Sequence, residues 1–178
     1  MSAEQIQSNF PAGVAVPRPI LVICEYLDRY GYPISGCFEI NTRDCEAESW
    51  FPGDPAMQKQ IAVFGNGSTG STYALWLSET QDPNSAPVVL LGSEGEFKAV
   101  ATSVLEFCRL LGCGYDELDM DDLSAPPKFW NETERFRDWI YHELHITSPR
   151  TGAEISGAAN SHSSTFADWV TKWQDANL

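Results

Sequence analysis

The sequence lacks a long apolar run. Its longest, Ile20 to Cys24, is far shorter than the ~20 residues that a membrane-spanning helix needs. Residues 1–8 also lack the basic stretch followed by an apolar stretch that marks a secretory signal. We therefore expect no membrane partner and a cytoplasmic location.

The cysteines lack the spacing of a disulfide framework or a metal site. Their number is odd, and no two of them form a C-x-x-C pair. This usage is typical of reduced thiols in the cytosol, where a cysteine acts as a small buried hydrophobic residue. The residues concerned are Cys24, Cys37, Cys45, Cys108 and Cys113.

Basic residues are scarce. The chain has 11 Lys and Arg against 25 Asp and Glu, which gives a formal net charge of −14. A field of this sign repels phosphate backbones and anionic lipids, so we expect no direct nucleic-acid binding. The same field speeds the encounter with a basic protein partner, although an acidic composition also serves solubility alone.

The chain does contain enough apolar material to fold by itself. It has 178 residues, 43% of them hydrophobic, and six tryptophans. A chain of this length buries a substantial core without disulfides or metals, and this composition is not that of a disordered protein. We therefore expect a folded protein that requires no cofactor.

The periodicity of the middle of the chain predicts an α+β fold. Strand-like stretches are separated by turn residues, and apolar positions on one helical face indicate helices before and after them. The predicted strands are Gly36 to Ile40, Gln60 to Phe64, Ser71 to Leu77, Pro87 to Leu91 and Phe97 to Val100. The predicted helices are Ile20 to Tyr30, one from Ser103 with a Ser103–Glu106 capping box, and one from Asn131 with an Asn131–Glu134 capping box, ending at Leu144. The simplest arrangement is a mainly antiparallel sheet of four to six strands flanked by helices.

Composition also divides the chain along its length. Residues 1–16 predict a loose N-terminal segment, and residues 17–146 predict the α+β domain, with a loop at 41–56. Residues 147–164 are rich in Ser and Gly and predict a linker. In residues 165–178, aromatic side chains recur at helical spacing, which predicts a C-terminal helix docked on the domain rather than an exposed partner-binding helix.

Residues Gly65 to Gly70 match the dinucleotide-binding pattern G-x-G-x-x-G. In such a site a helix begins at the glycine turn, so that its free N–H groups meet the pyrophosphate. Here a stretch rich in strand-forming residues, Ser71 to Leu77, follows the glycines at once. We therefore favour a hairpin, with a nucleotide-dependent enzyme as the alternative.

No other pattern predicts catalysis. His142 and His145 are separated by three positions rather than the four of the zinc motif H-E-x-x-H, and only His162 or scattered carboxylates remain as further ligands. The chain has no G-x-S-x-G nucleophile turn and no recognised catalytic cysteine signature. We expect neither a metal site nor an enzyme.

Several short motifs in order resemble the SUKH superfamily, which contains fungal cell-wall assembly regulators and bacterial toxin-immunity proteins. They are Val63-Phe64-Gly65, Tyr73-Ala74-Leu75-Trp76, Pro87 to Gly95 with its L-G-S-E-G stretch, Val100-Ala101 and Leu105-Glu106-Phe107. The resemblance covers roughly residues 38–111. It implies a sheet hairpin, a turn between strands at L-G-S-E-G, a following helix and no catalytic residues.

The resemblance also implies protein binding. Many bacterial members are thought to neutralise a toxin, often a nuclease, by covering its active site, and such toxins are commonly basic. Acidic residues in predicted loops are the candidate contacts: Glu94, Glu96, Asp116, Glu117, Asp119, Asp121 and Asp122. We therefore predict an immunity protein for a basic toxin domain. A housekeeping interaction protein without a toxin partner is the other non-catalytic alternative, and surface charge that serves only solubility is the alternative for these carboxylates.

Overall fold

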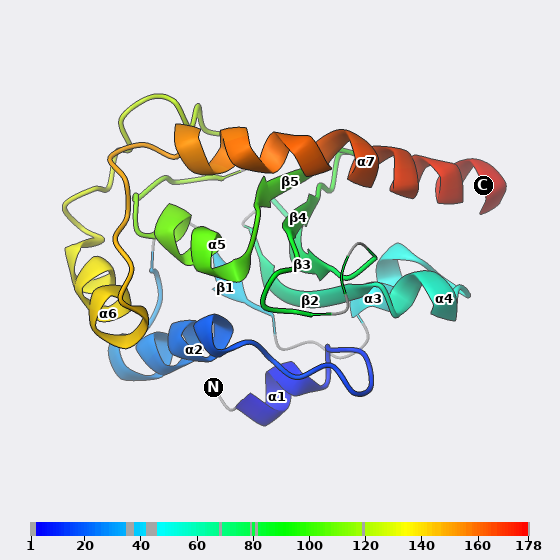
Figure 1. The fold of residues 1–178 in the computed structure, drawn as a ribbon, viewed down its shortest axis with the longest axis horizontal. Helices are drawn as coiled ribbons and strands as arrows, with labels where there is room; N and C mark the ends of the chain where they lie inside the picture. The colour runs from blue at the N-terminus through cyan, green and yellow to red at the C-terminus, as the bar shows by residue number, and fades with distance from the viewer. Residues whose placement is uncertain are drawn as a thin grey trace.

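Five antiparallel strands form one sheet, in which neighbours in the sheet are also neighbours in the sequence (Figure 1). The structure is a computed structural model that describes residues 3–34, 38–41, 46–67, 69–78, 80, 82–118 and 120–177. The strands are β1 (Glu39–Ile40), β2 (Ile61–Asn66), β3 (Thr72–Trp76), β4 (Val88–Leu91) and β5 (Phe97–Ala101). The predicted α+β class, with an antiparallel sheet of four to six strands, is confirmed.

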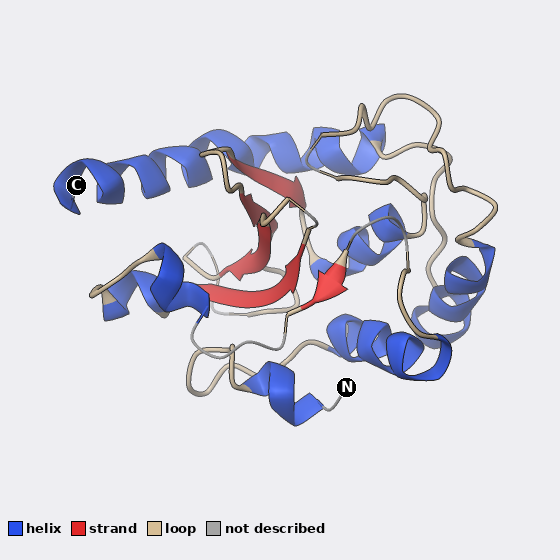
Figure 2. Ribbon diagram, turned by 180° about the vertical axis from the view of Figure 1, so that it is seen from behind, coloured by secondary structure: helices blue, strands red, loops and turns tan. Residues whose placement is uncertain are grey.

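Helices cover the sheet from two sides. They are α1 (Ala3–Gln7), α2 (Arg18–Tyr30), α3 (Glu46–Trp50), α4 (Pro55–Gln58), α5 (Val104–Leu111), α6 (Glu134–Leu144) and α7 (Ala153–Asn177). Figure 1 shows α7 running past β5, with α2, α5 and α6 grouped at one side and α3 and α4 at the other. The view from behind shows the same two groups (Figure 2).

Successive residues of each central strand enter different cores. In β3, Tyr73 and Leu75 belong to the core beneath α2 and α5, while Ala74 and Trp76 belong to the core beneath α7. This follows from the alternation of side chains along a strand. An antiparallel sheet commonly exposes one face to water, but here helices cover both faces. All five residues of β3 are consequently buried.

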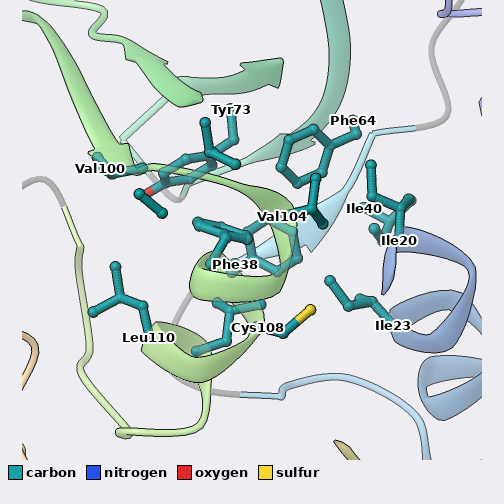
Figure 3. Close-up of a cluster of buried hydrophobic side chains, with 14 of the residues drawn as sticks. Ile20, Ile23, Phe38, Ile40, Phe64, Tyr73, Val100, Val104, Cys108 and Leu110 are labelled. Carbon is teal, nitrogen blue, oxygen red and sulfur yellow. The ribbon is translucent and has the colours of Figure 1, made fainter. Parts of the chain in front are cut away.

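The first core joins α2 and α5 to the sheet (Figure 3). Phe107 of α5 is fully buried, and its ring lies 5.3 Å from that of Phe38 and 5.5 Å from that of Phe64, between centroids. Ser103 caps α5 as predicted, because its Oγ accepts a hydrogen bond of 3.3 Å from the backbone N–H of Glu106. The other half of the predicted capping box is replaced, because the Glu106 carboxylate accepts hydrogen bonds from Arg109 instead. The capped helix thereby holds its apolar face against the sheet.

The second core lies between the sheet and α7. Phe166 is fully buried and packs on Trp76, with ring centroids 5.2 Å apart. Residues 153–164 belong to α7, so the predicted linker at 147–164 is wrong for that part. Ile155 and Ala159 are buried on the same helical face as Phe166, and this burial outweighs the weak helix preference of the intervening Ser and Gly.

Three other expectations are corrected. Residues 3–7 form α1 instead of a loose segment, because Ile6 is fully buried. The loop expected at 41–56 contains α3 and the start of α4, and the Asp54 carboxylate caps α4. The Asn131–Glu134 capping box predicted for the next helix is wrong: α6 begins at Glu134 without a side-chain cap, and its N-cap Thr133 donates its hydroxyl to the carbonyl oxygen of Gly112. Of the first predicted strand, Glu39–Ile40 is a strand, and Gly36 and Cys37 lie outside the described residues.

Within the described part of the chain, no helix is both long enough and apolar enough to span a membrane.

Candidate functional site

The turn between β4 and β5 presents two of the predicted acidic residues. Glu94 and Glu96 are both exposed there. The turn is closed by hydrogen bonds from Gly92 N–H to Glu96 O (2.7 Å) and from Gly95 N–H to Gly92 O (3.0 Å). Gly95 has a φ of +93°, a conformation that favours glycine. The backbone therefore fixes the direction in which the two carboxylates leave the sheet.

A second turn lies against the first. The hydroxyl of Ser93 donates a hydrogen bond of 2.9 Å to the carbonyl oxygen of Thr69, which belongs to the connection between β2 and β3. The hydroxyls of Thr69 and Ser71 lie 3.0 Å apart in the same connection. Residues 24 positions apart in the sequence are thus joined at one end of the sheet.

A pocket of about 180 Å³ opens where these turns meet a third segment. The third segment contributes Met120, whose exposed fraction is 75%. Carboxylates and hydroxyls supply the other lining, and none of the described residues that line the pocket is basic. The lining residues are Thr69, Ser71, Ser93, Glu94, Glu96 and Met120.

The predicted acidic loop at 116–122 has a defined conformation that some of its own carboxylates maintain. Oδ2 of Asp121 accepts hydrogen bonds from the backbone N–H groups of Asp116 (2.8 Å) and Glu117 (3.1 Å). Oδ1 of Asp122 accepts from the N–H and the hydroxyl of Ser124, and these bonds, the hydroxyl first, lower the pKa of Asp122. These two residues therefore have a structural task in the loop.

The remaining predicted acidic residues differ in position. Asp116 and Glu117 are half-buried. The Glu117 carboxylate reaches the β2–β3 connection, where its Oε2 lies 3.8 Å from the position that a Cβ would take at Gly67. Asp119 lies outside the described residues. The structure thus brings Glu94 and Glu96 together with the 116–122 loop, through Met120 of that loop.

Sequence reasoning missed Met120 and the three hydroxyl residues of the pocket. One signal for Met120 was present, because it is the apolar residue that directly precedes Asp121 and Asp122 in an otherwise acidic, hydrophilic run. The hydroxyl residues carried no comparable signal. Their role depends on the contact between two turns, which only the folded sheet creates.

The glycine pattern of residues 65–70 forms a hairpin connection. Gly67 N–H donates to Ser71 O at 2.8 Å, Gly70 has a φ of +87°, and strand β3 begins at Thr72. Ser68 lies outside the described residues. A pyrophosphate site needs the N-terminus of a helix at this point, and a strand occupies it instead. This geometry does not favour the nucleotide alternative.

The histidines lie at the end of α6 and within α7. His142 is in the last turn of α6, and His145 ends that helix with a φ of +57°, while its N–H donates to Tyr141 O at 3.1 Å. His162 lies in α7. Across the described ranges, no group of three His, Cys, Asp or Glu side chains is placed to hold a metal ion.

Three of the cysteines are buried free thiols. They are Cys24, Cys108 and Cys113. Burial raises the pKa of Cys24 and of Cys113 to about 12, and it raises that of Cys108 further. Thiols in this state are inert as nucleophiles. Cys37 and Cys45 lie outside the described residues.

The comparisons with known proteins add no relative to this description. No family model matches the chain, and neither a curated protein nor a solved structure matches it. The resemblance to the SUKH superfamily therefore rests on the sequence motifs given for it above.

Proposed function

We propose that this chain is a non-catalytic protein-binding module, an immunity protein that neutralises a basic toxin domain by direct contact. The observation that carries this proposal is the meeting of acidic segments around the exposed side chain of Met120, in a pocket whose described lining includes no basic residue. We call the surface formed by Glu94, Glu96, Asp116, Glu117 and Met120 the acidic end.

The acidic end has the composition of a contact surface for a basic partner. An exposed methionine adapts its shape to different apolar neighbours, and a ring of polar groups around an apolar centre is the usual anatomy of an interface. The carboxylates of Glu94 and Glu96 form no ion pair with another described residue. Their charge is therefore available to steer a basic protein into contact.

The positions of the SUKH-like motifs in the fold also support the proposal. The L-G-S-E-G stretch lies in the β4–β5 turn, the Tyr73 to Trp76 stretch forms most of β3, and Glu106-Phe107 lies on α5. This is the arrangement that the SUKH resemblance implies. In that superfamily the implied function is protein binding. For a bacterial member this binding would take place in the cytoplasm. The buried free thiols would also remain reduced there.

The proposal expects a toxin domain to be encoded by the neighbouring gene, and the test measures binding to that gene's product. A double variant, Glu94→Lys with Glu96→Lys, should lower the association rate constant by about tenfold at low salt and flatten its salt dependence. The matched control is Glu154→Lys with Asp168→Lys, since both residues are exposed on α7, away from the pocket. Equal rate constants for both double variants would refute the acidic end as the contact surface.

The immunity role itself is tested separately. Cells that express the neighbouring toxin should survive only when this chain is co-expressed, and the two proteins should co-purify. If the neighbouring gene encodes no toxin, or if its product does not bind, the housekeeping alternative replaces the immunity proposal.

A further inference from the structure

A second cleft lies away from the acidic end, between the last turn of α2 and the first half of α6. Its volume is about 590 Å³. Three tyrosines and three carboxylates are among the residues that line it: Tyr26, Tyr30, Tyr32, Glu132, Glu134 and Asp138. Arg135 also lines it and is the one basic residue in its described lining.

The tyrosine side of the cleft is a packed aromatic wall with an exposed surface. The ring centroids of Tyr26 and Tyr30 are 5.0 Å apart, and Trp139 lies 6.0 Å from Tyr30 behind them. Tyr30 is nevertheless 40% exposed, and Tyr32, which follows α2 and lines the same cleft, is 52% exposed. Large aromatic side chains that are fixed in place and still exposed are the residues most often used in recognition.

The protein's own arginines show what this wall accepts. The Cζ atom of Arg135 lies 5.1 Å from the centroid of the Tyr30 ring, and that of Arg29 lies 5.4 Å from the same centroid. Both distances are within the range of cation–π attraction. The ring face of Tyr30 therefore already holds the planar guanidinium group, which is the cation best suited to stacking on an aromatic ring.

The opposite side of the cleft supplies negative charge. Glu132, Glu134 and Asp138 are exposed, and none of them forms an ion pair with another described residue. Among the described residues that line the cleft, three carboxylates thus accompany a single arginine. A guanidinium group matches a carboxylate with two parallel N–H donors, so the charge and the aromatic wall select the same chemical group.

We propose that this cleft binds an arginine side chain of a protein partner, which stacks on Tyr32 and donates hydrogen bonds to Glu134 and Asp138. This site is built from α6, the last turn of α2 and the residues that follow α2, and it shares no residue with the acidic end. It therefore goes beyond the proposed immunity function and stands whether or not the partner is a toxin.

The test uses a small probe, N-acetyl-arginine methylamide, titrated into the full-length protein and followed by NMR chemical shifts. We expect saturable shifts at Tyr30 and Tyr32 with a dissociation constant of about 1–10 mM, because few groups contribute to so small a ligand. Uncharged N-acetyl-glutamine methylamide serves as the negative probe. Choline tests the rival assignment, a quaternary ammonium ligand.

Four single variants test which residues bind the probe. Tyr32→Leu and Glu134→Gln should each weaken probe binding by about three- to tenfold. Tyr141→Leu and Asp168→Asn are the matched controls, because Tyr141 is 55% exposed and both residues lie outside the cleft; they should leave binding unchanged.

A fifth variant changes affinity in the opposite direction. Arg135→Gln removes a competing cation from the cleft, so it should strengthen probe binding by about two- to fivefold. A residue with a purely structural role would not produce this gain, and the variant remains informative if Tyr32→Leu disturbs the fold. The proposal is overturned by the absence of saturable shifts, by equal shifts with the glutamine probe, by binding of choline without arginine, or by unchanged affinity in both Glu134→Gln and Arg135→Gln.

Discussion

The hydroxyl of Ser163 on α7 satisfies both backbone polar groups of Ala99 on the edge strand β5. Its oxygen accepts a hydrogen bond of 3.0 Å from the N–H of Ala99, and the hydroxyl lies 3.4 Å from the carbonyl oxygen of the same residue. An uncovered edge strand is a template for pairing with other chains. Helix α7 therefore closes this edge of the sheet as well as one of its faces.

Replacing Ser163 tests this closure. Ser163→Ala leaves the buried N–H and carbonyl of Ala99 without partners, so we expect a loss of about 1–3 kcal/mol in the free energy of unfolding. Urea denaturation measures it. Ser161→Ala is the control, because Ser161 lies exposed on the same helix and bonds only within it. Equal stability of the two variants would contradict the role of Ser163.

Replacing each of two glycines with alanine should change the free energy of unfolding in opposite directions. Gly114 has a φ of +94°, and an added Cβ would lie 2.6 Å from the backbone carbonyl of Phe129, so Gly114→Ala should cost about 1–3 kcal/mol or more. Gly157 lies within α7 with nothing within 4 Å of an added Cβ. Gly157→Ala should therefore stabilise the protein by about 0.5–1 kcal/mol. Thermal unfolding of both variants, compared with the parent protein, measures the two changes in stability. A change in the same direction for both variants would contradict the prediction.

The buried thiols predict a labelling pattern. Burial raises the pKa of Cys24 and Cys113 to about 12, so almost no thiolate exists at pH 8, and Cys108 is fully buried as well. Iodoacetamide at pH 8 should leave these three residues unmodified in the native protein and modify them in urea. Peptide mass spectrometry reads each site separately. Rapid native labelling at any of the three would show that the core opens locally.

Asp122 predicts a pH dependence of stability. Its pKa is lowered in the folded protein, so its stabilisation is complete above the ordinary carboxyl pKa of 3.8 and is lost as the pH falls through the lower folded value. Asp122→Ala should lower the melting temperature at pH 7, and the difference from the parent should shrink below pH ~3.8. Asp175→Ala, which removes an exposed carboxylate in the last turns of α7, is the control for the loss of a surface charge. A difference that persists at pH 2 would indicate that the carboxylate charge is not the cause.

The strands were predictable because each has strand-forming residues bounded by glycine, proline or asparagine. The turn at Ser93 to Glu96 and the cap at Ser103 were readable for the same reason, since both depend on local chemistry. Helix α4 also carried a local signal that was overlooked: Asp54 followed by Pro55, a capping residue before the first helical position.

Helix α7 was only half predictable. Residues 165–177 show aromatic side chains at helical spacing, but residues 153–164 are dominated by Ser, Gly and Ala. Their helix forms because small side chains such as Ala159 and Ser163 allow close approach to β5. That approach, like the pocket at Met120 and the tyrosine cleft, arises from tertiary contact, which local sequence patterns do not encode.

The burial of β3 on both faces has an evolutionary consequence. A change at any position from Tyr73 to Trp76 disturbs one of the two cores, whereas the turns that carry Glu94 and Met120 project beyond them. Descendants of such a chain can therefore alter their specificity one turn residue at a time while inheriting an unchanged interior. Rapid divergence should concentrate at the end of the sheet and spare its middle.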